Sequence, residues 1–241
     1  MKVFSGTDIG QVRKMNQDFL FASAEAVGNL PNLFVVADGM GGHAAGDFAS
    51  RYGVSVLVET IKKDSNFNPV KIIRQGIEAA NREVLEQARK DSSMAGMGTT
   101  MVVATIVGGY VYVANVGDSR LYLADSDNMT QITQDHSLVA EMIRLGELTP
   151  EEGAHHPDRN IITRAVGTAE EVRIDFFDYK LEQDDRIILC SDGLYNMVEN
   201  EEIFRILRGS DPEDKAQILI RRANENGGRD NIGVIVIEPF S

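Results

Sequence analysis

The sequence is poor in cysteine, in positive charge and in long apolar runs, and each shortage disfavours a class of protein. Cys190 is the only cysteine among 241 residues, so no intrachain disulfide can form, which suits a reducing cytoplasm. The formal charge is −13, from 24 basic and 37 acidic side chains, which disfavours binding to nucleic acids or anionic membranes. No apolar run reaches the roughly 18 residues of a membrane-spanning helix, and no signal sequence is evident. We therefore expect a soluble, cytoplasmic protein.

The pattern of short strands and amphipathic helices predicts a single α+β domain over residues 1–241. Linkers, low-complexity tracts and fixed-period repeats are missing, and nothing in the sequence demands more than a monomer. Short, β-branched strands are predicted at 33–37, 99–107, 110–116, 120–124, 186–190 and 232–237. Gly108-Gly109 and residues 126–128 are typical of turns, so we expect the central strands to pair antiparallel.

Capping residues and apolar spacing predict three helices. Asn68 and Pro69 form a start signal, and an apolar stripe at three- and four-residue spacing continues to about residue 90. A second helix is predicted over residues 44–63. A third is predicted to begin at Asp211 and Pro212 and to stop at residues 227–228, which are both glycine.

Four aspartates lie within a few residues of a predicted strand end, beside glycine or a small polar residue: Asp38, Asp118, Asp192 and Asp230. A single Asp-Gly pair after a strand is usually only a turn, but four such sites can converge at one end of a layered fold. Two carboxylates about 5 Å apart repel by roughly 3 kcal/mol at an effective dielectric constant of about 20. A cluster therefore needs cations, and oxygen ligands without cysteine favour Mg²⁺, Mn²⁺ or Ca²⁺ over zinc.

Eight motifs, in order along nearly the whole chain, resemble the type-2C metal-dependent serine/threonine protein phosphatases in their compact bacterial form. They are VRKMNQD (12–18), VADGMGGH (36–43), GMGTT (96–100), VGDSRLY (116–122), DHS (135–137), HPDRNIITRAVG (156–167), LCSDGL (189–194) and GGRDNIGVIVI (227–237). One such motif alone is weak, whereas eight in order are specific. The resemblance implies a central antiparallel β-sandwich with a helical layer on each outer face, and a flap-like segment at about 138–167.

The resemblance also implies a two-metal hydrolase that uses Mn²⁺ or Mg²⁺. Asp38 would bridge the two ions, the carbonyl of Gly39 would bind one, and Asp192 and Asp230 would bind the other. Asp118, together with Asp192, matches positions that hold a third, looser ion in bacterial relatives. Such ions would activate water to hydrolyse phosphoserine and phosphothreonine in proteins without a covalent intermediate.

Three further residues take roles by resemblance. Arg13 matches the arginine that clamps the substrate phosphate, and its planar guanidinium suits two phosphate oxygens. Asp18 would act through metal-bound water, although Gln17 stands where some relatives carry glutamate. Met40 replaces the histidine that is the general acid in many members, so either His43 or a metal-bound water is expected to serve. The implied partners are phosphoproteins, including a serine/threonine kinase and its substrates.

Other interpretations stay open at this point. One alternative is a partner-switching phosphatase with one dedicated substrate, but Arg13 and the flap-like segment favour the general form. Another is a pseudophosphatase that binds without turnover; loss of Asp192 or Asp230 would signal that state, and both are present. Residues 39–44 with Glu59 also fit a dinucleotide-binding fingerprint, but the later βαβ units are missing. Residues 125–129 begin like a calcium loop but read as a polar turn, and His155 and His156 read as a solvated pair that could touch the substrate. Cys190 is expected in the core, and the acidic run 199–202 at an exposed helix start.

Overall fold

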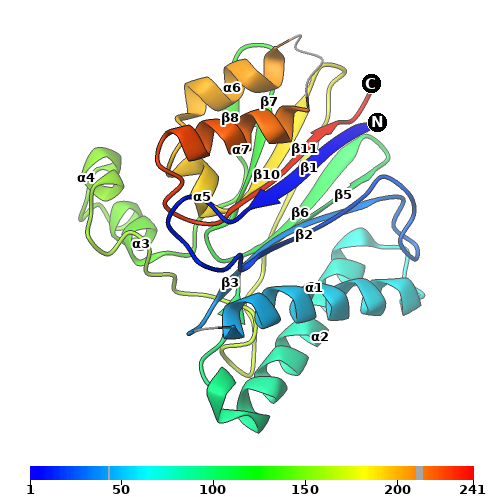
Figure 1. The fold of residues 1–241 in the computed structure, drawn as a ribbon. Coiled ribbons are helices and arrows are strands. Elements are labelled where there is room, and N and C mark those ends of the chain that lie inside the picture. Colours follow the sequence, from blue (N-terminus) through cyan, green and yellow to red (C-terminus); the bar gives the residue numbers. More distant parts are fainter. Residues whose placement is uncertain (43, 210–213) are drawn as a thin grey trace.

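Two antiparallel β-sheets lie face to face, and helices cover both outer faces of the stack (Figure 1). The computed structural model describes residues 1–42, 44–209 and 214–241. In chain order the elements are β1 (Lys2–Asp8), β2 (Asp18–Ser23), β3 (Leu33–Met40), α1 (Ala45–Lys63), α2 (Pro69–Lys90), the 3₁₀ turn η1 (Ser92–Met94), β4 (Gly98–Thr99), β5 (Met101–Val107), β6 (Tyr110–Val116), β7 (Arg120–Ala124), β8 (Met129–Gln131), α3 (Leu138–Arg144), α4 (Pro150–Ala154), β9 (Asp175–Lys180), β10 (Arg186–Cys190), α5 (Asp192–Tyr195), α6 (Asn200–Arg208), α7 (Lys215–Glu225) and β11 (Ile232–Glu238).

Each sheet draws its strands from distant parts of the chain. One has the order β1-β11-β10-β7-β8, and the other has the order β2-β3-β5-β6-β9, with β4 paired to β3. Helices α1 and α2 cover the second sheet, while α5, α6 and α7 cover the first (Figure 1). The predicted α+β sandwich with a helical layer on each outer face is therefore confirmed.

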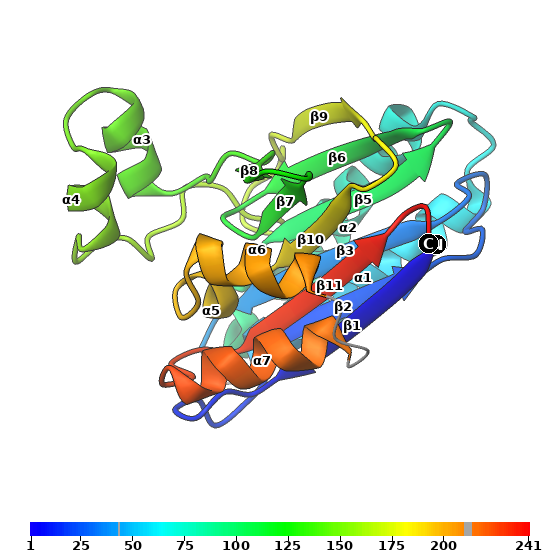
Figure 2. The same ribbon diagram turned by 90° about the horizontal axis from the view of Figure 1, so that it is seen from above.

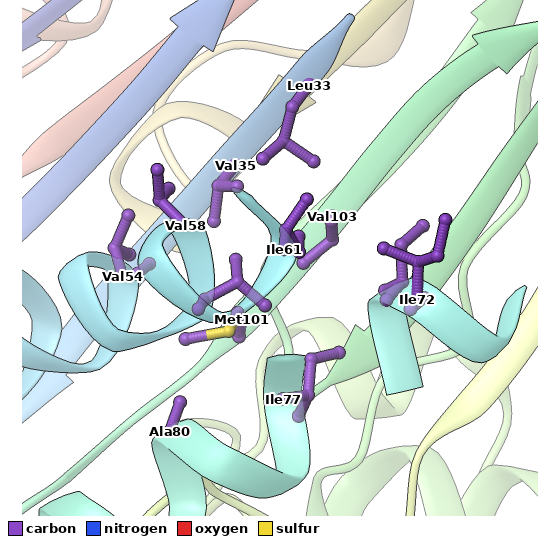
Figure 3. Packing of buried hydrophobic residues seen from close by; sticks show 14 of the residues in the cluster. Leu33, Val35, Val54, Val58, Ile61, Ile72, Ile77, Ala80, Met101 and Val103 are labelled. Atoms are coloured by element: carbon purple, nitrogen blue, oxygen red, sulfur yellow. The ribbon is translucent and has the colours of Figure 1, made fainter. Parts of the chain in front are cut away.

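Strand β3 shows how period-two alternation builds these layers. Figure 3 shows Leu33 and Val35 in the apolar cluster that also contains side chains of α1 and α2. Phe34 and Val36 belong instead to the cluster between the two sheets. Because successive side chains of a strand point to opposite faces, Asp38 continues the row of Phe34 and Val36. The aspartate therefore stands where the inter-sheet core ends.

The predicted helices over 44–63 and 69–90 are confirmed as α1 and α2. The side chain of Asn68 accepts a first-turn backbone N–H at 3.0 Å, and Pro69 begins α2. The third predicted helix is confirmed as α7, but Asp214 caps it and its first residue is Lys215. The predicted start signal at Asp211 and Pro212 lies outside the described residues.

The predicted strands are confirmed with one interruption. Thr100 separates β4 from β5, and its backbone N–H donates to the carbonyl of Asp38 in β3 at 2.8 Å. Gly108 and Gly109 form the β5–β6 turn with φ of 59° and 81°, a conformation that glycine adopts without strain. The sequence did not predict four strands, which lie at sheet edges, are only partly buried and so show weak apolar alternation: β1, β2, β8 and β9.

Helices α3 and α4 stand away from the sandwich (Figure 2), within the predicted flap-like segment. The base of this segment is a short two-stranded stem, in which Leu138 N–H donates to the carbonyl of Ile161 at 2.8 Å and Thr163 N–H donates to that of His136 at 2.7 Å. Motion of the segment stays a prediction. None of the described helices is both long and apolar enough to cross a membrane.

Candidate active site

Turns at one end of the sandwich bring the predicted aspartates together. Asp38 lies near the end of β3, and Asp118 lies in the turn that carries the chain from β6 in one sheet to β7 in the other. Asp192 begins α5 directly after β10, and Asp230 comes just before β11. A cavity of about 280 Å³ is lined by these predicted residues: Arg13, Asp38, Gly39, Asp118, Asp192 and Asp230.

Asp18 and Asp38 lie opposite each other on the β2–β3 pair. One carboxylate oxygen of Asp18 accepts a hydrogen bond from the hydroxyl of Ser191 at 2.6 Å, while the other is buried without a partner. Burial raises the pKa of Asp18 to about 7. Burial, followed by the negative charge of Asp18, also raises the pKa of Asp38 well above its usual value. This pair is stable only when a proton or a cation compensates its charge.

Asp118 and Asp192 form a second pair of interacting carboxylates in the cavity. Burial, followed by the charge of Asp135, raises the pKa of Asp118 to about 6. Burial, followed by the charge of Asp118, raises the pKa of Asp192 well above its usual value. One oxygen of Asp192 accepts a hydrogen bond from Asn196 at 3.2 Å, and the other is buried without a partner.

Arg13 supplies positive charge at the edge of this cluster. Its guanidinium Nη2 lies 2.6 Å from a carboxylate oxygen of Asp230 and forms an ion pair with it. The Arg13 side chain is 52% exposed, whereas that of Asp230 is 28% exposed. The arginine therefore faces solvent on one side and the carboxylates on the other, as a group that receives an anion from solution must.

Two glycines pack so closely against backbone that no side chain fits. A Cβ atom on Gly39 would lie 1.9 Å from the carbonyl oxygen of Gly46, and one on Gly193 would lie 1.9 Å from that of Asn231. The Asp-Gly pairs at 38–39 and 192–193 are therefore required by packing as well as by any ligand. This requirement explains their residue type without reference to a metal.

The residues of the cavity, with Asp18 buried beside Asp38 just behind its lining, suit a hard divalent cation in donor chemistry. Two buried carboxylate oxygens, one on Asp18 and one on Asp192, have no hydrogen-bond partner, and burial raises the pKa of both groups. In the described parts of the chain, however, no three His, Cys, Asp or Glu side chains already surround one point closely enough to hold an ion. Asp230 is instead paired with Arg13 at 2.6 Å. Backbone carbonyls and water would complete the coordination of Mg²⁺ or Mn²⁺.

Sequence reasoning missed the side chains that support the aspartates. The Thr100 hydroxyl accepts the Asp38 N–H at 2.9 Å. The Arg120 guanidinium lies 3.6 Å from the ring centre of Tyr195, whose hydroxyl donates to the carbonyl of Asp118 at 3.0 Å. All three residues stand in or beside the recognised motifs, which was the available signal. Their contacts depend on pairings that the sequence does not display.

The remaining sequence predictions have mixed outcomes. His43, the predicted general acid, lies outside the described residues. Cys190 is buried, as predicted, and burial raises the pKa of its thiol to about 12. Asp125 accepts two backbone N–H groups, which confirms a polar turn at 125–128. Residues 39–42 do lead from β3 toward α1, but the antiparallel sheets lack the βαβ setting of a dinucleotide site.

Comparisons with known proteins decide the family. The profile of the family described as protein phosphatase 2C matches residues 6–223. This chain belongs to that family. The serine/threonine phosphatase Stp of Listeria innocua is 39% identical over 239 residues, covering 96% of this chain and 93% of the relative.

Solved structures of the protein phosphatase 2C family agree with the fold. The Streptococcus agalactiae serine/threonine phosphatase superposes with a TM-score of 0.90 at 39% identity and covers 98% of both chains. The catalytic domain of the serine/threonine protein phosphatase PstP, described in complex with two manganese ions, has a TM-score of 0.85 at 31% identity. That comparison covers 98% of this chain and 96% of the other.

Proposed function

We infer that this chain is a protein serine/threonine phosphatase, and we propose that it hydrolyses phosphoserine and phosphothreonine monoesters with the help of Mn²⁺ or Mg²⁺. The observation that carries the proposal is the cavity at the end of the sandwich, which is lined by four aspartates from separate strand ends and by a solvent-facing arginine at their edge. Its family and the phosphatases similar to it support the same reaction.

We assign the ligands of two ions to Asp38, the Gly39 carbonyl, Asp192 and Asp230, and a third site to Asp118 with Asp192. Asp18 would act through water. These ions, when bound, would lower the pKa of an attacking water and neutralise charge on the phosphate. The buried carboxylates contribute the negative charge that would hold such ions, and their raised pKa values indicate that a cation would stabilise the site.

Arg13 would bind the phosphate. Its guanidinium can donate two parallel hydrogen bonds to phosphate oxygens. Because the side chain is exposed on one side, a phosphate group can reach it from solution. The overall charge of −13 repels a phosphoprotein at long range, so this local cation and the metal ions would provide the attraction. His43 stays the predicted proton donor to the leaving serine or threonine oxygen, with a water as the alternative.

The substrates are phosphoproteins, and we propose that they include a serine/threonine kinase of the same cell and the proteins it phosphorylates. We also propose that the protein acts as a monomer in the cytoplasm. A single catalytic domain spanning residues 1–241 is consistent with the continuous sandwich core.

Phosphate release from a phosphothreonine peptide tests the function. We expect turnover that needs Mn²⁺, stops with EDTA, and falls by at least about 100-fold in Asp192→Ala, because the substitution removes a charged ligand. Asp127→Ala is the matched control, since Asp127 is an exposed turn residue that lies outside the eight motifs. Folded, Mn²⁺-binding protein without turnover would contradict the proposal and favour a phosphoprotein-binding role.

A further inference from the structure

Asn231 is buried, and its side-chain amide forms hydrogen bonds to the loop of residues 9–17, which carries Arg13. Its amide nitrogen donates to the carbonyl oxygens of Ile9 and Met15, at 2.9 Å each. Its amide oxygen accepts the N–H of Gln17 at 2.9 Å. These three bonds join residues that are 214 to 222 positions apart in the sequence. Both amide donors and the amide oxygen therefore bond to the backbone of one loop.

The same loop also lies directly on the backbone of the turn before β11. The Gln11 N–H donates to the carbonyl of Gly228 at 2.7 Å. Gly10 has φ of 79°, and a Cβ atom there would lie 2.3 Å from the carbonyl oxygen of Asp230. The loop is thus docked by backbone contacts that leave no space for a side chain at residue 10.

Gln17 extends this link to the other sheet. Its carbonyl accepts the N–H of Gly39 at 3.0 Å and the hydroxyl of Ser50 at 2.7 Å. Asn231 adjoins β11 of one sheet, whereas Gly39 belongs to β3 of the other. The backbone of Gln17 therefore connects the two sheets at the point where their aspartates meet.

Arg13 has little else to hold it. Its side chain is half-exposed, and within the described residues it forms a hydrogen bond to Asp230 alone. Asp230 is also a proposed metal ligand, so this contact competes with the ion. The position of the guanidinium then depends on the backbone of the loop.

We propose that Asn231 is a positioning residue that sets where Arg13 meets the substrate phosphate. The proposal rests on the proposed phosphatase function. Asn231 also lines the cavity, and its backbone N–H donates to a carboxylate oxygen of Asp230 at 2.9 Å, but its side-chain amide acts on Arg13 through the loop backbone. A displacement of about 1 Å in such a group can lower a rate about 100-fold, so the three amide bonds matter for turnover.

The test measures phosphate release from a phosphothreonine peptide at saturating Mn²⁺ for the wild type, Asn231→Ala, Arg13→Ala and the double variant. We expect Asn231→Ala to lower kcat/KM by about 10- to 100-fold. The Mn²⁺ dissociation constant, measured by calorimetry, should change by less than about threefold. In the Arg13→Ala background the Asn231 substitution should lower kcat/KM by less than about threefold, because the effects of two residues that act through one group are not additive.

Asn32→Ala is the matched control. Asn32 is also buried, and its amide donates to the carbonyl of Ile106 at 3.0 Å and accepts the Ile106 N–H at 2.7 Å, at the opposite end of β3. It should lose comparable stability while keeping its kcat/KM. Trypsin cleavage after Arg13 or Lys14 should become several-fold faster in Asn231→Ala but not in Asn32→Ala, because only the first frees the loop.

Asn231→Asp covers the case in which the alanine variant does not fold. It keeps the shape of the side chain but loses both amide donors, so the same loss of kcat/KM and the same faster cleavage are expected. A folded variant with the kcat/KM of the wild type would overturn the positioning role while leaving the phosphatase function intact. Additive losses in the double variant, or weaker Mn²⁺ binding that accounts for the loss, would also overturn it. No phosphate release by the wild type would instead refute the function, and the trypsin comparison would still decide whether Asn231 holds the loop.

Discussion

Replacing Asp118 with asparagine should make the protein more stable in the presence of EDTA, although it removes a proposed metal ligand. Asp118 is 7% exposed, and its pKa is raised from the usual 3.8 to about 6, first by burial and then by the charge of Asp135. Ionising this carboxyl in the folded protein is therefore unfavourable. Asparagine has nearly the same shape and carries no charge at any pH.

The size of the effect follows from the pKa difference. A carboxyl whose folded pKa is raised contributes stability below its unfolded pKa and loses that contribution as the pH rises through the folded value. A shift of about two units corresponds to about 3 kcal/mol above pH 6. By the same relation the advantage of asparagine is only about 1 kcal/mol at pH 4.5. For a chain of this size, 3 kcal/mol raises the melting temperature by about 6–12 °C.

Thermal unfolding of the wild type and Asp118→Asn in EDTA at pH 4.5 and pH 8 measures this difference. We expect a clear gain in melting temperature at pH 8 and a much smaller gain at pH 4.5, with Asp127→Asn unchanged as an exposed control. Saturating Mn²⁺ should narrow the gap, because the ion stabilises the wild-type carboxylate. A gain that is the same at both pH values, or a loss at pH 8, would refute the reasoning.

Three other predictions test the site and the core. Gly193→Ala should lower both the melting temperature and kcat, because its Cβ would lie 1.9 Å from the Asn231 carbonyl oxygen; unchanged values would contradict this packing. Calorimetry should show tighter Mn²⁺ binding as the pH rises from about 6 to 8, because the ion needs ionised carboxylates and burial raises the pKa of Asp18 to about 7. An Mn²⁺ affinity that stays constant over this range would contradict a role of the buried carboxylates in binding the ion. Ile73→Ala should lower the free energy of unfolding in urea by about 2–5 kcal/mol, because Ile73 is 0% exposed, without changing the Mn²⁺ requirement; a changed requirement would mean that the core and the site are coupled.

In the candidate site, features that depend on neighbouring residues were predictable from the sequence, whereas contacts between distant segments were not. Each aspartate could be found in the sequence because it lies within a few residues of an apolar strand end, beside glycine or a small polar residue, and the order of the motifs indicated the family. Glycine is also required at positions 39 and 193 for a reason that the sequence does not display, because these residues pack against the carbonyls of Gly46 and Asn231. Such a contact cannot be inferred from either segment alone.

The sequence by itself determined the helices α1 and α2, the central strands and the turn at residues 108–109, because caps, apolar spacing and turn residues act over only a few positions. Only the tertiary structure decided that Asp118 lies where the chain changes sheets, that Arg13 meets Asp230, and that Asn231 holds the loop of Arg13. These relations join residues up to 222 positions apart. They arise when antiparallel pairing aligns the ends of strands from two sheets, and the burial that raises the carboxyl pKa values exists only after those sheets have packed.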